Sequence, residues 1–252
     1  MKLRILHIAL CAWIFVSCRS YYQPEFISAN ATNINKETVA KDDSAVSAII
    51  YPYKMALDTI MSQVLVENIS VLTKAKPEGT LNNMFCDVQL ELVSNQHKEF
   101  APMFCVMNYG GIRLPSIAAG NITRGKVYEL MPFDNEVVIA KIKASTVKEL
   151  CDKIAAKGGE PVAGISMSIK ANVATDININ KMPLNDTTQY YILVSDYMLN
   201  GGDGYGFLKE QAISIHPLNV KVRDVIIGEL ELMQAKGQKL SAVKDGRIKE
   251  VK

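Results

Sequence analysis

The stretch Tyr190-Tyr-Ile-Leu-Val-Ser-Asp-Tyr-Met-Leu-Asn-Gly-Gly-Asp-Gly-Tyr205 holds the pattern that decides the fold. Its first five residues are aromatic or aliphatic without a break, which is typical of a strand buried on both faces of a sheet. From Asp196 the chain becomes polar and glycine-rich, which is typical of a loop. Ligand sites in α/β sheets lie where strand ends lead into such loops. We therefore expect a buried strand followed by a binding loop.

A second apolar run shows the same transition. Residues 103–107 read Met-Phe-Cys-Val-Met and predict another buried strand, which leads into the loop Asn108-Tyr-Gly-Gly-Ile-Arg113. The sequence Met131-Pro-Phe133 follows shortly afterwards. Glycine pairs in both loops would let the backbone approach a ligand closely. These polar and aromatic segments are the first candidates for a binding site.

Hydrophobic spacing predicts the remaining elements. Helical periods indicate helices over residues 51–66, 80–96, 123–130, 145–157 and 219–236. Further strands are expected over residues 68–73, 137–142, 165–170, 173–180 and 247–251. Mixed strands and helices in this order predict a single α/β (α+β) domain with a mixed sheet, spanning residues 44–252.

Composition excludes several classes of protein. The chain has 252 residues, of which 48% are hydrophobic and 21% charged, and its mean hydropathy is near zero. This is the composition of a globular protein and not of a disordered or multi-pass membrane chain. The formal net charge is +2, and no long Lys/Arg run occurs. A surface for nucleic acid, whose affinity rests on phosphate neutralisation, is not expected.

The first residues predict export and a lipid anchor. Residues 1–17 combine a short basic start with an apolar run that is too short to span a bilayer, as in a signal peptide. Phe15-Val-Ser-Cys18 resembles a bacterial lipobox, so Cys18 is the predicted lipidation site, and ordinary cleavage to a free secreted protein is the alternative. Polar residues 18–43 predict a flexible tether. We expect a bacterial cell-envelope location, periplasmic or on the outer surface.

The cysteines and histidines do not form a metal or redox motif. Cys86, Cys105 and Cys151 are widely spaced in apolar or helical stretches, which predicts buried small side chains or one disulfide in an oxidising compartment. His97 and His216 are the only histidines after the leader, and both are expected at the surface. No metal site is predicted on this chain.

Three segments together resemble one family. Asn108 to Arg113 is similar to the Asn-Gly-Gly-Gly-Ile-Arg motif of the C-terminal domain of 5′-nucleotidases. Ile122 to Phe133 resembles the stretch of that family that leads to a Pro-Phe pair, and Asp196 to Tyr205 resembles its Asn-Asp-Tyr/Phe-x-x-x-Gly-Gly-Asp-Gly signature. The three motifs occur in the family's order over roughly residues 44–250, and they imply that family's fold.

The resemblance implies a nucleotide site. Phe133 and Tyr197 would sandwich the base, because every base has a π-face. Asp203 would accept hydrogen bonds from the ribose hydroxyls, and Asn108 would bind the base edge. Arg113 would hold the phosphate through its planar fork. Taken singly, each residue also has a structural interpretation, as core, packing or turn.

Two departures from the family pattern concern the phosphate. Tyr109 replaces the middle glycine of the first motif, which would crowd the loop or add a ring to the pocket. The further arginines of the family are absent from residues 82–98, where Lys98 is the only basic residue. A weaker phosphate site, or one completed by a partner, follows from this difference.

The family's catalytic half has no counterpart in the sequence. Its N-terminal domain binds two metal ions through Asp-x-His, Gly-Asn-His-Asp/Glu and Gly-His-x-His segments, which do not occur here. We therefore expect no catalytic residue and no cofactor on this chain, with divalent metals on a separately encoded metallophosphatase partner. The alternatives are a stand-alone nucleoside- or nucleotide-binding lipoprotein and a degenerate remnant that binds nothing.

Overall fold

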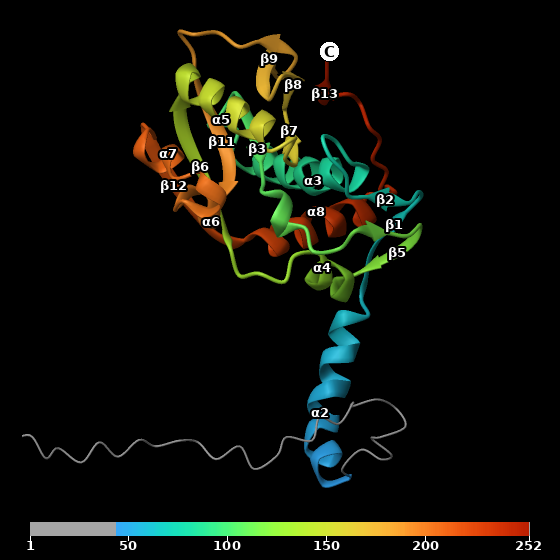
Figure 1. The fold of residues 1–252 in the computed structure, drawn as a ribbon. Helices are drawn as coiled ribbons and strands as arrows, with labels where there is room; N and C mark the ends of the chain where they lie inside the picture. Colours follow the sequence, from blue (N-terminus) through green and yellow to red (C-terminus); the bar gives the residue numbers. More distant parts are fainter. Residues whose placement is uncertain (1–43, 252) are drawn as a thin grey trace, which may run out of the picture. The chain divides into compact units, whose positions relative to one another are not determined.

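The computed structural model describes residues 44–251, and Figure 1 shows its fold. The chain divides into two units, of which the first ends at Ile50 and the second begins at Tyr51. Helix α2 (Ser44–Met61) has no buried residue. No helix within residues 44–251 is long and apolar enough to cross a bilayer. The predicted signal peptide (1–17), the tether (18–43) and Cys18 lie outside the described residues.

A mixed five-stranded sheet forms the centre of the second unit. Its order is β12 (Ser214–Lys221), β6 (Glu136–Lys143), β11 (Gln189–Ser195), β3 (Met103–Val106) and β7 (Val162–Ala163). Strands β3 and β11 run parallel, with Ile192 opposite Phe104. Strand β6 runs antiparallel to β11 on its other side. The mixed α/β fold expected from the sequence is therefore confirmed.

Both faces of this sheet are buried, which explains its apolar strands. Alternate residues of β6 face opposite ways: Val137 and Ile139 pack in one core, and Val138 and Ala140 pack in the other. Helices α3 (Thr80–Gln96) and α8 (Val222–Ala235) cover the first core. Helix α5 (Ala144–Ala156) covers the second (Figure 1).

Three smaller sheets complete the fold. A four-stranded sheet has the order β10 (Met182–Pro183), β9 (Val173–Ile179), β8 (Ile165–Lys170) and β13 (Ile248–Glu250), and α5 packs on β9. The two-stranded sheets pair β1 (Val64–Asn68) with β5 (Gly120–Thr123), and β2 (Leu72–Thr73) with β4 (Ser116–Ile117). The short helices are α4 (Arg124–Leu130), α6 (Asp196–Leu199) and α7 (Phe207–Glu210).

The segment after α2 differs from the prediction. The expected helix over 51–66 ends at Met61, and residues 64–68 form β1. The expected strand over 68–73 is replaced by the end of β1 and the short β2. Adjacent Leu65 and Val66 are both fully buried, and Val66 pairs with Ile122 of β5. Short apolar runs fit helix and strand alike, so the tertiary pairing decides.

Helix α8 also begins later than predicted. Residues 219–221, expected to be helical, belong to β12, and α8 starts at Val222. Lys221 still pairs with Glu136 of β6 after an irregularity in the register. The sheet therefore keeps these residues extended. Asn219 takes a positive φ of 53°, which an asparagine tolerates better than most residues.

The sheet brings three segments to one edge. Because β3 and β11 are parallel neighbours, the loops that follow them leave the sheet at the same edge. The antiparallel β6 begins at that edge, where Val137 lies opposite Ser195. Phe133 precedes β6 by three residues, and Tyr197 follows β11 by two. The topology therefore brings all three motif segments to this edge of the sheet.

Candidate functional site

The first loop is folded tightly around Asn108. Asn108 is 8% exposed. Its backbone carbonyl accepts the N–H of Gly111 at 3.0 Å across a 3-10 turn (Tyr109–Gly111). A Cβ on Gly111 would lie 3.0 Å from Asn108 Oδ1, so this glycine allows the close turn. Arg113 N donates to Leu130 O at 2.9 Å, which ties the loop to the end of α4.

The second loop requires its glycines. Ser195 Oγ accepts from Met198 N at 3.3 Å and caps the one-turn helix α6. A Cβ on Gly202 would lie 2.4 Å from Tyr197 Cε1, so the Tyr197 ring lies directly against the backbone there. Asp203 has φ = 55°, in the left-handed region that few side chains adopt. A strained conformation of this kind is a recurrent feature of binding sites.

One group of contacts joins the two loops at Asp203. Asn108 Nδ2 donates to Asp203 Oδ2 at 2.9 Å, although the two residues are 95 positions apart. Tyr197 OH lies 3.4 Å from Asp203 Oδ1. Tyr197 is 43% exposed, so its ring is open to solvent although its hydroxyl contacts Asp203. The structure therefore brings Asn108, Tyr197 and Asp203 together.

A second group contains Arg113 and Phe133. The Arg113 guanidinium carbon lies 5.7 Å from the centre of the Phe133 ring, which is within cation–π range. Phe133 is 38% exposed, and its carbonyl accepts from Arg223 Nη1 at 3.1 Å. Arg223 also pairs with Asp134, and its hydrogen bond lowers the pKa of that carboxyl. Within residues 44–251, no hydrogen bond, ion pair or ring contact directly joins the two groups.

Two lysines that the sequence interpretation missed lie beside Tyr109. Lys74 Nζ lies 3.9 Å from the centre of the Tyr109 ring, and Lys76 Nζ lies 5.0 Å from it. Lys74 Nζ also donates to Ile112 O at 2.7 Å. Burial, and then the positive charge of Arg113, lower the pKa of Lys74. Both lysines belong to the segment between β2 and α3, outside residues 82–98.

The three cysteines within residues 44–251 (Cys86, Cys105 and Cys151) are free and buried. Burial raises the pKa of the Cys151 thiol to about 12. Burial and the neighbouring Cys105 also raise the pKa of the Cys86 thiol. Between residues 44 and 251 no three His, Cys, Asp or Glu side chains are placed to hold a metal ion. His97 is half-buried beside Glu99, and His216 packs on Phe100.

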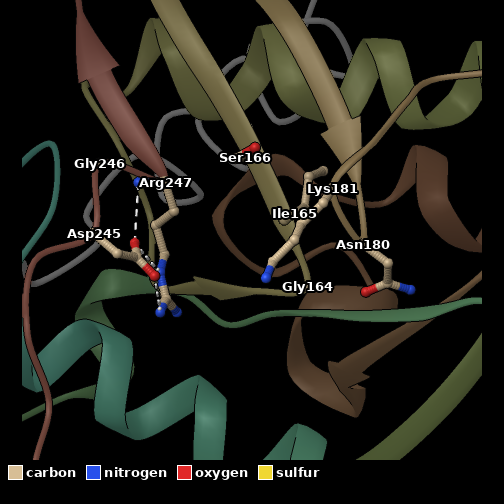
Figure 2. Close-up of a pocket in the computed structure, with 8 residues that line it drawn as sticks. All are labelled: Gly164, Ile165, Ser166, Asn180, Lys181, Asp245, Gly246 and Arg247. Carbon is tan, nitrogen blue, oxygen red and sulfur yellow. Dashed lines mark hydrogen bonds and ion pairs between the residues drawn. The ribbon is translucent and has the colours of Figure 1, made fainter.

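A separate groove lies among β8, the β9–β10 turn and the segment before β13. Figure 2 shows its lining, which encloses about 600 Å³ and contains none of the five predicted site residues. Arg247 lines this groove. Its guanidinium nitrogens donate to the carboxylate oxygens of Asp87 at 2.6 and 3.1 Å and to those of Asp245 at 2.9 and 2.8 Å. A fifth hydrogen bond reaches the carbonyl of Val162. These charges are satisfied within the protein, so the groove is a weaker candidate than the sheet edge.

Comparison with known proteins places this chain in a family. The sequence matches the family described as 5′-nucleotidase, C-terminal domain, over residues 58–210. A 5′-nucleotidase of Vibrio parahaemolyticus is 35% identical over 120 residues, covering 45% of this chain and 21% of that protein. Human 5′-nucleotidase is 24% identical over 240 residues, covering 80% of this chain and 41% of that protein.

The fold agrees with a solved structure. The 5′-nucleotidase precursor of Thermus thermophilus superposes with a TM-score of 0.70 at 23% identity, covering 85% of this chain and 45% of that one. The chain belongs to the 5′-nucleotidase C-terminal domain family. It is a substrate-binding domain of that family, and it spans less than half the length of each of these relatives.

Proposed function

We propose that the sheet edge binds a nucleoside phosphate. The observation that carries this proposal is the bond from Asn108 Nδ2 to Asp203 Oδ2 at 2.9 Å, which holds the two motif loops together while the Tyr197 and Phe133 rings stay exposed. The exposed Tyr197 ring beside the fixed Asp203 carboxylate suits a ligand that has a flat base and a sugar. Stacking on such rings contributes about 1–3 kcal/mol per base.

Each side chain has a role that its chemistry supports. Phe133 and Tyr197 stack on the base, and Asn108 has a donor and an acceptor for the base edge. Asp203 accepts from the ribose hydroxyls, since an ionised carboxylate only accepts hydrogen bonds. Arg113 binds the phosphate, because a guanidinium can bond two oxygens at once. Lys74, beside it, adds positive charge at the same end of the site.

The hydrolysis itself we assign to a separate metallophosphatase. Proteins that the chain resembles are named 5′-nucleotidases, and the residues described here contain no group that could hold a metal ion. In this proposal the partner supplies the divalent metals, which activate water and stabilise the phosphoryl transition state. This chain supplies recognition of base, ribose and phosphate.

Mixing the purified chain with a lone two-metal phosphoesterase domain tests the division of labour. The chain should raise the turnover of AMP, and the Phe133→Ala variant should raise it much less, since the stacking ring is gone. The Phe100→Ala variant is the matched control, because its ring packs on Tyr191 and His216 and lies outside the proposed site. Unchanged turnover at every mixing ratio would contradict the partner role.

Calorimetry with adenosine, AMP and inorganic phosphate separates the alternatives. Stronger binding of AMP than of adenosine agrees with a domain that presents nucleotides for hydrolysis. Tight adenosine binding with no gain from phosphate favours a stand-alone nucleoside-binding protein. Tyr109 and the changed basic residues are the features that favour a remnant, for which all three ligands would give no heat.

We also propose that the chain is a lipoprotein of a bacterial cell envelope. The support is the leader pattern of residues 1–17 and the cysteine at position 18. Two acyl chains on Cys18 would anchor a globular domain, because each buried CH₂ contributes about 0.8 kcal/mol. Metabolic labelling with a radioactive fatty acid should mark the wild-type chain and fail to mark Cys18→Ala. Equal labelling of both would disprove the assignment.

A further inference from the structure

Glu160 lies between the two loops of the proposed site. It follows α5 and the Gly158-Gly159 pair, and its side chain is 3% exposed. A Cβ on Gly159 would lie 2.4 Å from Pro77 O, and φ at this residue is +110°, so only glycine suits this close approach. Met107 N donates to Pro161 O at 3.0 Å and fixes the segment beside β3. Glu160 is therefore held firmly in place.

The two carboxylate oxygens of Glu160 contact different loops. Oε2 accepts the backbone N–H of Tyr109 at 2.5 Å, next to Asn108. Oε1 accepts the hydroxyl of Tyr205 at 3.1 Å, two residues after Asp203. Lys157 Nζ lies 3.5 Å from Oε1 and partly balances the charge. A buried carboxylate is stable only with such partners, because burial otherwise disfavours the ionised form.

The direction of the Tyr205 hydrogen bond follows from its surroundings. Tyr205 is fully buried. Burial raises the pKa of its hydroxyl far above the usual range, and the negative charge of Glu160 raises it further. The phenol therefore keeps its proton, and its O–H donates a hydrogen bond to Glu160. A carboxylate that accepts from both loops fixes the distance between them.

We infer that Glu160 is a positioning residue of the nucleotide site. By holding the backbone at Tyr109 and the ring of Tyr205, it sets Asn108 and Asp203 at bonding distance before a ligand arrives. Preorganisation of this kind increases affinity because less ordering remains for the binding step. The inference rests on the proposed nucleotide-binding function.

Substitution at Glu160 measures the effect directly. Glu160→Ala removes both acceptors and should lower the affinity for adenosine and for AMP alike, by about tenfold, because the two loops must then be ordered in the binding step. Glu160→Gln keeps one acceptor oxygen and should lose less. Glu229→Gln is the matched control, because Glu229 is a buried carboxylate of α8 and makes no hydrogen bond or ion pair to residues 108–113 or 196–205. Its affinities should equal those of the wild type.

A double-variant cycle distinguishes positioning from plain stabilisation. If Glu160 acts through Asp203, then Glu160→Ala should weaken binding much less in an Asp203→Ala background than in the wild type. Equal fold-losses in both backgrounds, or affinities unchanged by both Glu160 variants, would overturn the inference. A wild-type chain that binds neither adenosine nor AMP would instead overturn the proposed function, and the inference with it.

Hydrogen exchange gives a readout that needs no ligand. In Glu160→Ala, amides of residues 108–113 and of residues 196–205 should both exchange faster, because the carboxylate restrains both loops. Glu229→Gln should leave both segments at the wild-type rate. Faster exchange in only one segment would show that Glu160 does not link the loops, whatever the binding data.

Discussion

The proposed site and the Arg247 groove are both built from charged side chains that are distant in sequence, yet they differ in how those charges are used. In the groove, Arg247 makes four hydrogen bonds to the carboxylates of Asp87 and Asp245, so its bonding capacity is used within the fold. Figure 2 shows the contact between Arg247 and Asp245. In the site, Arg113 is exposed, and its guanidinium lies over the Phe133 ring without a hydrogen bond or ion pair to any residue between 44 and 251.

The two regions differ in whether their charged side chains remain available to a ligand. The buried framework of the site is satisfied, since Glu160 accepts from Tyr109 and Tyr205. The groups at its surface keep free faces and donors. A satisfied guanidinium stabilises the fold, whereas an exposed one on a rigid support can bind a phosphate. Substitutions in the two regions should therefore affect different measurements.

Breaking the Arg247 cluster should give the largest effect, and it should be on stability. Arg247→Met removes the hydrogen bonds that connect β13 to α3 and should cost about 2–3 kcal/mol, because the two carboxylates lose a charged partner. The expected fall in Tm is about 5–10 °C for a domain of this size. Thermal unfolding measures the fall, and calorimetry should give an unchanged affinity for AMP. Weaker AMP binding at a temperature where the variant is folded would contradict the separation of the two regions.

Removing a stacking ring should give the opposite result. Phe133→Ala should weaken AMP and adenosine binding by about 1–3 kcal/mol, because one aromatic face is lost. Its effect on Tm should be small, since the ring is 38% exposed. Phe100→Ala, a truncation of a ring that packs on Tyr191, should reverse this pattern and lower Tm without changing affinity. Equal affinity of Phe133→Ala and wild type would show that the base lies elsewhere.

Local sequence pattern was enough for the elements that carry the site. The helical period over residues 80–96 predicts α3 with the bounds that the structure has, although its N-cap is Gly79 and not a side-chain oxygen. The apolar run at 190–194 predicts β11 within two residues, and the family motifs indicate which loops matter. Long, strongly patterned segments of this kind leave little choice of structure.

The supporting residues could not be found in the same way. Lys74 and Lys76 lie in a turn, and Glu160 follows a glycine pair, so each resembles a solvated charge in its local context. Their partners are distant in sequence: Tyr109 is 51 residues from Glu160, and Asp87 is 160 residues from Arg247. Only the packing of the sheets brings such pairs together. The helix predicted over residues 51–66 is wrong at residues 64–66 for the same reason, because the pairing of β1 with β5 overrides the local period.

A smaller effect should separate phosphate from base recognition. Arg113→Gln should weaken AMP binding by about 1 kcal/mol, or about fivefold, because a charged donor to the phosphate is lost. Adenosine, which has no phosphate, should bind as before. Arg124→Gln is the matched control, since Arg124 pairs with Glu231 of α8 and not with the proposed site. An equal loss for adenosine and AMP would place Arg113 near the base and not near the phosphate.

The smallest effect should come from Glu229, a buried carboxylate that serves neither region. Burial raises its pKa, and the charge of Glu91 raises it further, while Lys236 acts in the opposite sense. Because the folded-state pKa lies above the unfolded value of about 4.5, the ionised group opposes folding at neutral pH. Stability should therefore rise as the pH falls through the folded-state pKa, and the gain is complete below the unfolded value.

Glu229→Gln should remove this contribution. The variant should be more stable than the wild type at pH 7, by up to about 1 kcal/mol or about 3 °C in Tm, and the difference should shrink as the pH approaches 4. Thermal unfolding at a series of pH values measures both curves. A constant difference across the range would mean that the side chain acts through packing and not through its charge. Nucleotide affinity should stay unchanged throughout, because no contact of Glu229 reaches the loops that Glu160 holds.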